Sequence, residues 1–318
     1  MSEIVVFQQM CMIAILIMTG YISYRKGLIN LEVSRGISAL VVNVCNPMLL
    51  IKSGLERDTG ITADKLLLAA AGGVILYLIL LASALVLPRL LRVEVKWRKH
   101  YALMCLFGNT GFIGIPLTSA VLGSGSVIYV AVINLFYNLL FYTLGIKLAD
   151  PEDGQFSFRS FVNVGNIGAI AAILLFVFQL KVPMVISSTV THLANATTFL
   201  AMVVVGVSLA RADVKAMLKN LRMYLFIAIR FVVVPIIISF VLRLFIKDDL
   251  IFGVMVLMAC VPVGNLPLMR VEEKGGDGRV LSNGIILSTI LSIITIPIVV
   301  AFVLRYDLSW SRSLSVLC

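Results

Sequence analysis

The chain has 318 residues, of which 60% are hydrophobic and only 13% are charged, and its mean hydropathy is +1.07. A soluble domain of this length needs far more polar surface, so the composition excludes that class of protein. The formal net charge of +10 does not indicate a nucleic-acid partner, because the basic residues lie between apolar runs without interleaved aromatic residues. Five scattered cysteines without C-x-x-C spacing predict neither a disulfide framework nor a metal site.

Apolar runs of about 20 residues follow one another along the chain, and this is the length that spans a hydrocarbon core. Each run is expected to be helical, because lipid offers no hydrogen-bond partner to an exposed backbone. The first run lacks a basic segment before it and a small-residue cleavage site after it, so we interpret it as a retained span. We expect ten transmembrane helices, at about 4–24, 34–54, 64–88, 100–122, 126–147, 163–180, 185–210, 218–245, 250–270 and 282–304.

The distribution of basic residues predicts the orientation of these spans. Most of the 26 Lys and Arg residues fall in the loops on one side, such as 89–99 and 211–222. The excess of positive charge marks the cytoplasmic side, which places both termini on the outside of the membrane. An even number of spans agrees with this orientation. The predicted location is a bacterial-type cell inner membrane, with the lipid bilayer as the surrounding partner.

The chain resembles two five-helix halves, 1–149 and 163–318, joined by a cytoplasmic connector at 150–162. Asn46 and Asn195 lie at related places in the second and seventh spans, and Pro116 and Pro267 in the fourth and ninth. Because each half has an odd number of spans, the second half is expected to be inverted in the membrane. Inverted repeats with interrupted helices at matching positions indicate a transport site near the midplane.

The fourth and ninth spans are expected to be broken. The fourth reads GNTGFIGIP from position 108, and the ninth reads VPVGNLP from position 261. Glycine and proline at this density oppose a continuous helix. Each break creates a half-helix N-terminus whose N–H groups attract anions. An alternative is that the glycines only allow close helix packing and the prolines only cause kinks.

Arg230 and His192 lie deep inside the predicted spans, away from their ends. Arg230 is near the middle of the eighth span, and no carboxylate lies at that depth to neutralise it. It binds either an incoming anion or the backbone carbonyls of a broken helix, and the sequence leaves both roles open. His192 in the seventh span can carry a proton, although a lone histidine is more often structural.

These patterns select a set of candidate substrate-binding residues next to the breaks or facing the expected cavity. No catalytic residue, metal ligand or cofactor is expected, apart from a possible coupling Na⁺ or H⁺. The candidates are Asn46, Asn109, Thr110, Gly111, Asn138, Arg230, Pro262, Gly264 and Asn265.

Three stretches of the chain resemble signatures of the auxin efflux carrier family. They are GNTGFIGIPL at 108–117, KGGD at 274–277 and ILSTILSIITIP at 286–297. The resemblance covers essentially the whole chain, and the short connector at 150–162 resembles bacterial members of the family. In the ninth span the chain continues with Met269 and Arg270, where members of the family commonly have alanine.

The resemblance implies an all-α fold of two inverted five-helix repeats, with a scaffold domain and a transport domain that moves as an elevator. The broken fourth and ninth helices would cross beside the substrate, and Asn109 would contact its carboxylate. The implied substrate is a small organic carboxylate, malonate-like or malate-like, and an auxin-like aromatic carboxylate is the alternative. The implied assembly is a homodimer formed through the scaffold.

Two other classes of function compete with a carrier. An intramembrane enzyme needs a nucleophile and base, a metal cluster or paired acids within the spans, and the sequence has only two histidines and no H-E-x-x-H motif. A channel usually presents rings of pore-lining residues in a symmetric oligomer. We therefore expect a secondary active transporter of an organic anion.

Overall fold

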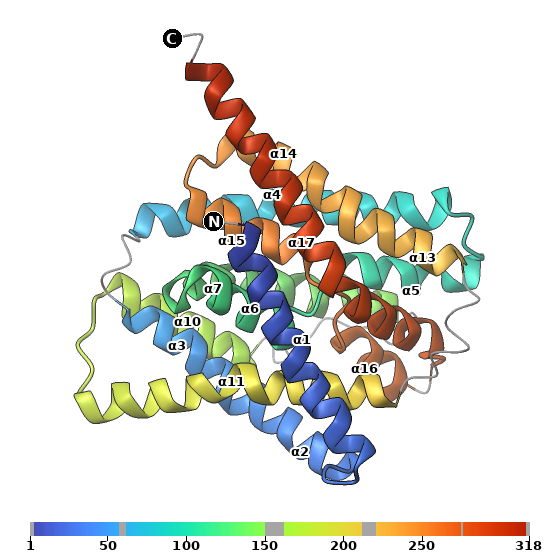
Figure 1. Cartoon of the computed structure of the whole chain (residues 1–318), viewed down its shortest axis with the longest axis horizontal. Helices are drawn as coiled ribbons and strands as arrows, with labels where there is room; N and C mark the ends of the chain where they lie inside the picture. The colour runs from blue at the N-terminus through green and yellow to red at the C-terminus, as the bar shows by residue number, and fades with distance from the viewer. Residues whose placement is uncertain (1–2, 57–61, 150–161, 212–220, 275, 316–318) are drawn as a thin grey trace.

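The computed structural model describes residues 3–56, 62–149, 162–211, 221–274 and 276–315. These residues are built from helices without a strand, which confirms the all-α prediction for the described parts (Figure 1). The predicted connector at 150–162 lies outside the described residues except for its last position.

The chain consists of α-helices, some of which are joined by short π-helical turns. The first half contains α1 (Glu3–Arg25), α2 (Leu31–Leu40), α3 (Asn46–Leu55), α4 (Ala63–Leu90), α5 (Val95–Leu106), α6 (Ile115–Leu122), α7 (Val127–Leu140) and α8 (Ile146–Ala149). The second half contains α10 (Val164–Val177), α11 (Met184–Ala210), α13 (Leu221–Ala228), α14 (Val234–Phe245), α15 (Asp249–Cys260), α16 (Leu266–Glu273) and α17 (Arg279–Ser315).

Proline accounts for most of the π-helical turns. The four turns in the described residues are η1 (Val41–Cys45), η2 (Thr110–Gly114), η4 (Phe141–Gly145) and η5 (Ile229–Val233). Three of them end two residues before a proline, namely Pro47, Pro116 and Pro235. A proline has no N–H to donate and its ring clashes with the carbonyl four residues earlier, and a widened turn relieves that clash.

Seven helical segments in the described residues are long and apolar enough to cross a membrane. They correspond to the first, second, third, fifth, seventh, eighth and tenth predicted spans. The other three predicted spans hold shorter apolar helices, Thr110–Leu122, Val164–Val177 and Asp249–Cys260. In the fourth and ninth spans the helix is short because it is interrupted. Since only seven described segments are long enough to span by themselves, the count of ten spans stays a prediction.

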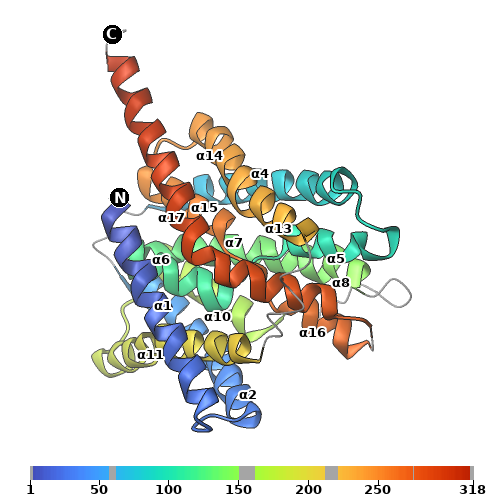
Figure 2. The ribbon, with the colours of Figure 1, turned by 45° about the vertical axis from the view of Figure 1, so that its right-hand side comes forward.

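The helices form two packed groups. The first helix group contains α1, α2, α3, α10 and α11, and the second helix group contains α4 to α8 and α13 to α17. In Figure 1, and again in Figure 2, α2 and α11 lie toward the bottom and α4 and α14 toward the top. The broken helices α5–α6 and α15–α16 belong to the second group.

Glycine lets the helices of the first group approach one another closely. A Cβ atom on Gly206 of α11 would lie 2.0 Å from the carbonyl oxygen of Ile17 in α1. A Cβ atom on Gly54 of α3 would lie 2.3 Å from the carbonyl oxygen of Ala172 in α10. Because the neighbouring atoms belong to the backbone, no side chain can move aside, and these helix pairs form a tight unit.

Candidate functional site

The interruptions of the fourth and ninth spans lie side by side and run in opposite directions. The backbone N–H of Asn109 donates a hydrogen bond to the carbonyl of Pro262 at 2.7 Å. The N–H of Gly264 donates to the carbonyl of Phe107 at 2.9 Å, and Gly108 forms an antiparallel bridge with Val263. The two breaks therefore satisfy part of each other's backbone, as buried non-helical chain requires.

The residue types at the crossover explain why the chain breaks there. A Cβ atom on Gly264 would lie 2.7 Å from the carbonyl oxygen of Gly108, so only glycine allows the two backbone segments to approach this closely. Pro262 cannot donate a backbone hydrogen bond, but its carbonyl accepts one from the facing break. The N–H of Val263 donates to Ser288 Oγ of α17 at 3.1 Å, which anchors the ninth span to the last helix.

Asn109 and Asn265 occupy equivalent places, each just before the second half of a broken helix. The side-chain oxygen of Asn109 caps η2 by accepting a hydrogen bond from the N–H of Phe112 at 3.1 Å. The backbone carbonyl of Asn265 accepts from the N–H of Met269 at 3.0 Å, which begins the first turn of α16. Both asparagines therefore lie at the positive end of a half-helix.

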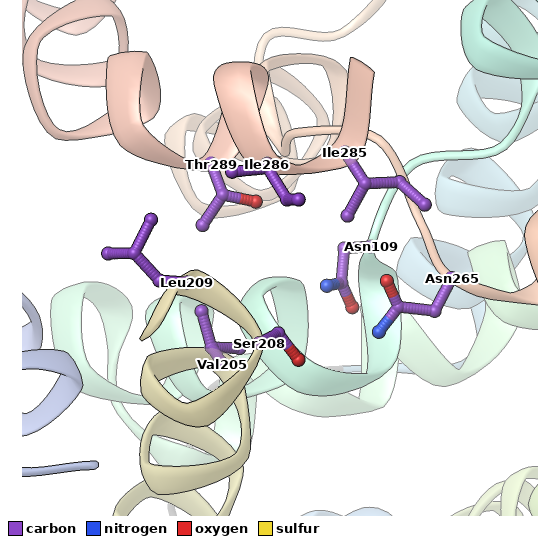
Figure 3. Close-up of a pocket in the computed structure, with 8 residues that line it drawn as sticks. All are labelled: Asn109, Val205, Ser208, Leu209, Asn265, Ile285, Ile286 and Thr289. Carbon is purple, nitrogen blue, oxygen red and sulfur yellow. The ribbon is translucent and has the colours of Figure 1, made fainter. Parts of the chain in front are cut away.

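A cavity of about 290 Å³, which includes its opening to solvent, lies beside this crossover. Figure 3 shows the carboxamides of Asn109 and Asn265 next to each other, with α17 on one side and α11 on the other. The cavity lies between the two helix groups, and none of the described residues that line it has an ionisable side chain. The lining residues are Asn109, Val205, Ser208, Leu209, Asn265, Ile285, Ile286 and Thr289.

The sequence selected two of these eight residues. Asn109 and Asn265 were recognisable because each follows a helix break, whereas the lining residues of α11 and α17 belong to uninterrupted apolar helices. Ser208 and Thr289 gave only a weak signal, since a hydroxyl on an apolar helix usually bonds to its own backbone, as Ser208 does to the Val204 carbonyl at 3.1 Å.

The remaining candidates near the crossover shape its backbone. Asn46 Nδ2 donates to the carbonyl of Gly111 at 3.3 Å, which connects the first helix group to the start of η2. Thr110 is buried in that same turn. Pro262 and Gly264 contribute backbone hydrogen bonds, as described above. None of these five candidate residues, Asn46, Thr110, Gly111, Pro262 and Gly264, is among the described residues that line the cavity.

Arg230 does not line the cavity. Its side chain is only 1% exposed, and its guanidinium donates to two backbone carbonyls, those of Cys105 at 2.7 Å and Ala259 at 3.0 Å. Of the two roles that the sequence left open, this geometry matches the binding of carbonyls of the broken helices. The prediction of direct contact between Arg230 and substrate therefore receives no support from this arrangement.

Asn138 and His192 also lie apart from the cavity lining. Asn138 Nδ2 donates to Asn166 Oδ1 at 2.5 Å, which joins α7 to α10 across the two helix groups. His192 is exposed on α11, 13 residues before Val205, so about 20 Å of helix separates it from the cavity. Its position gives no support to a proton carrier at this site. The sequence placed both residues in the right helices but could not predict which way they face.

Comparison with known proteins agrees with the predicted class. A family model described as "Membrane transport protein" matches residues 5–163 and 154–300. The chain is also similar to a protein of the archaeon Methanothermobacter thermautotrophicus that carries the description "uncharacterized transporter". The two are 25% identical over 296 residues, which cover 90% of this chain and 94% of the relative.

Proposed function

Because the chain belongs to the family of membrane transport proteins, as the resemblance to auxin efflux carriers predicted, we propose that it is a secondary active transporter of a small organic anion. The observation that carries this proposal is the cavity in which Asn109 and Asn265 lie at two half-helix N-termini. Ser208 of the first helix group lines the same cavity.

The chemistry of the cavity favours a carboxylate. The two carboxamides and the hydroxyl of Thr289 supply donors, and the half-helix N-termini add a positive potential. Among the described lining residues there is no carboxylate to repel an anion or to bind a cation. The other half of the lining is aliphatic, with no aromatic side chain to stack on a ring. This lining favours a short carboxylate of the malonate or malate type over an auxin-like aromatic one.

The position of the cavity between the two helix groups suits alternating access. In an elevator, the second helix group would carry the bound anion past the first group, which would act as the scaffold.

The close contacts of the first group support an inverted repeat of 1–149 and 163–318. In such a repeat the first span corresponds to the sixth and the second to the seventh, so the contact of the first span with the seventh is equivalent to that of the sixth with the second. A Cβ atom on Gly20 would lie 2.3 Å from the Val203 carbonyl, as one on Gly54 would from the Ala172 carbonyl.

The proposed setting is a cell inner membrane of bacterial type, with both termini outside and a homodimer formed through the first helix group. No cofactor is proposed, and Na⁺ or H⁺ is the candidate coupling ion. The described residues that line the cavity include no nucleophile–base pair, which favours a carrier over an intramembrane enzyme. A channel is the other alternative, which transport kinetics distinguish from a carrier.

Uptake of labelled malonate, malate, lactate, citrate and indole-3-acetate into proteoliposomes tests the proposal, with and without Na⁺ or proton gradients. Wild type is compared with Asn109→Ala and with Asn43→Ala, whose exposed side chain donates a hydrogen bond to the Ala39 carbonyl one turn earlier in the same span. Saturable uptake and counterflow that Asn109→Ala abolishes and Asn43→Ala keeps are expected. Single-channel currents would indicate a channel, and uptake of none of these acids would contradict the proposed substrate class.

A further inference from the structure

One guanidinium group holds the ends of both helices that lead into the crossover. Arg230 lies in η5, between α13 and α14, and is the largest of the fully buried side chains. Its Nε donates to the carbonyl of Cys105 at 2.7 Å, and its Nη1 donates to the carbonyl of Ala259 at 3.0 Å. Cys105 and Ala259 are each the residue before the last in α5 and α15.

These two carbonyls belong to the negative ends of helix dipoles. The last four carbonyls of a helix have no partner within it, and the dipole places roughly half a negative charge at that end. Together α5 and α15 therefore present about one negative charge to the centre of the membrane domain. Among the described residues, no ion pair includes Arg230, so its positive charge is opposed chiefly by these carbonyl ends.

The crossover also contains two positive ends, the N-termini that begin at Asn109 and Asn265. Without Arg230, the two negative and two positive helix ends would largely cancel at this point. We propose that Arg230 is a built-in cation that neutralises the carbonyl ends of α5 and α15, so that the N-terminal ends give the empty cavity a positive potential and no bound metal cation is needed there. The proposal rests on the anion-binding function proposed for the same cavity and assigns Arg230 a positioning and electrostatic role.

A simpler role for Arg230 is that of a hydrogen-bonding clamp whose charge is irrelevant to the cavity. Two substitutions separate the roles. Arg230→Gln keeps an N–H₂ group that can donate to both carbonyls but removes the charge, and Arg230→Lys keeps the charge but loses the planar fork. If the charge sets the potential of the cavity, the lysine variant resembles wild type and the glutamine variant does not.

The potential can be measured with a cysteine at Ser208, which lines the cavity from α11. In a Cys11→Ser, Cys318→Ser background, Ser208→Cys is modified with an anionic and a cationic methanethiosulfonate reagent, and the ratio of the two rates is recorded. The matched control is His192→Cys, at an exposed position of the same helix. Relative to this control, the ratio at position 208 should favour the anionic reagent. Arg230→Gln should reduce that preference up to about tenfold, and Arg230→Lys should retain it.

Each outcome supports or contradicts a role of the Arg230 charge in the potential of the cavity. An unchanged ratio in Arg230→Gln, or an equal fall in Arg230→Gln and Arg230→Lys, would contradict a role of the charge. Size-exclusion chromatography shows whether Arg230→Gln folds. If it does not, the comparison of the two positions with Arg230 intact still tests the proposal. Equal ratios of the two modification rates at positions 208 and 192 would overturn it. The measurement needs no transported substrate. Failure of the uptake panel would therefore count against the proposed function alone.

Discussion

The backbone N–H of Asn109 donates a hydrogen bond to the carbonyl of Pro262 at 2.7 Å, although the two residues lie in opposite halves of the chain. With the Gly264–Phe107 hydrogen bond, this contact makes the two breaks one structural unit. The orientation of Asn109 and Asn265 in the cavity therefore depends on both breaks, because a shift of either backbone moves the asparagine that follows it.

Gly264→Ala is expected to disrupt this unit. The new Cβ atom would lie 2.7 Å from the Gly108 carbonyl oxygen and 3.2 Å from that of Phe107, and backbone must move to accommodate it. Overpacking of this kind costs about 1–3 kcal/mol, so the melting temperature in detergent should fall and uptake should be lost. Gly36→Ala is the control, since its Cβ meets nothing within 4 Å and a helical alanine is favoured. Equal melting temperatures for the two variants would contradict the proposed packing.

Gly206→Ala tests the packing of α1 against α11 in the first helix group. Its Cβ atom would lie 2.0 Å from the Ile17 carbonyl oxygen and 2.7 Å from the Tyr21 nitrogen, so α1 and α11 must separate. We expect a lower melting temperature and lower yield of monodisperse protein, measured by fluorescence-detected size exclusion. A variant as stable as wild type would show that α1 and α11 can part at little cost.

Asn109→Asp separates the two tasks of this side chain. An aspartate can still accept the hydrogen bond from the Phe112 N–H, so η2 should remain capped and the melting temperature should change little. It also places a negative charge in the cavity, where like-charge repulsion opposes a carboxylate substrate. Uptake of the transported acid should fall at least tenfold at pH 7. Preserved uptake would mean that the anion binds elsewhere.

The stability of the protein should weaken in acid through Asp248, which lies before the start of α15. Burial by itself raises the pKa of this carboxyl, but the Lys65 ammonium at 2.8 Å and the N–H groups of Ile251 and Leu250 outweigh it, and the pKa is lowered from 3.8. A lowered pKa in the folded state contributes stability above the ordinary pKa, and this contribution is lost as pH falls through the lower value.

The melting temperature of wild type should therefore exceed that of Asp248→Asn at pH 7, and the difference should shrink below about pH 4. The effect should correspond to no more than about 1 kcal/mol, because the pair is partly exposed. Lys65→Met should remove most of the same difference, and the double variant should not add to it. A difference that is independent of pH would exclude Asp248 as its source.

The membrane class, the helical character of the described residues and the positions of the two breaks could be predicted from the amino-acid sequence. These properties are local: the backbone of a membrane segment must satisfy its own hydrogen bonds within one helix, and glycine and proline interrupt that pattern wherever they cluster. Asn109 and Asn265 were predictable for the same reason, since each lies within such a cluster.

Which residues of different helices contact one another could be seen only in the three-dimensional structure. Arg230 reaches carbonyls of α5 and α15, and Ser208 and Thr289 face the two asparagines from α11 and α17. Asn138, a candidate binding residue in the sequence, and His192, a candidate proton carrier there, lie apart from the cavity lining. These contacts depend on how each helix is rotated and packed against helices distant in the chain. An apolar run surrounded by lipid and protein shows little periodicity that would reveal that rotation.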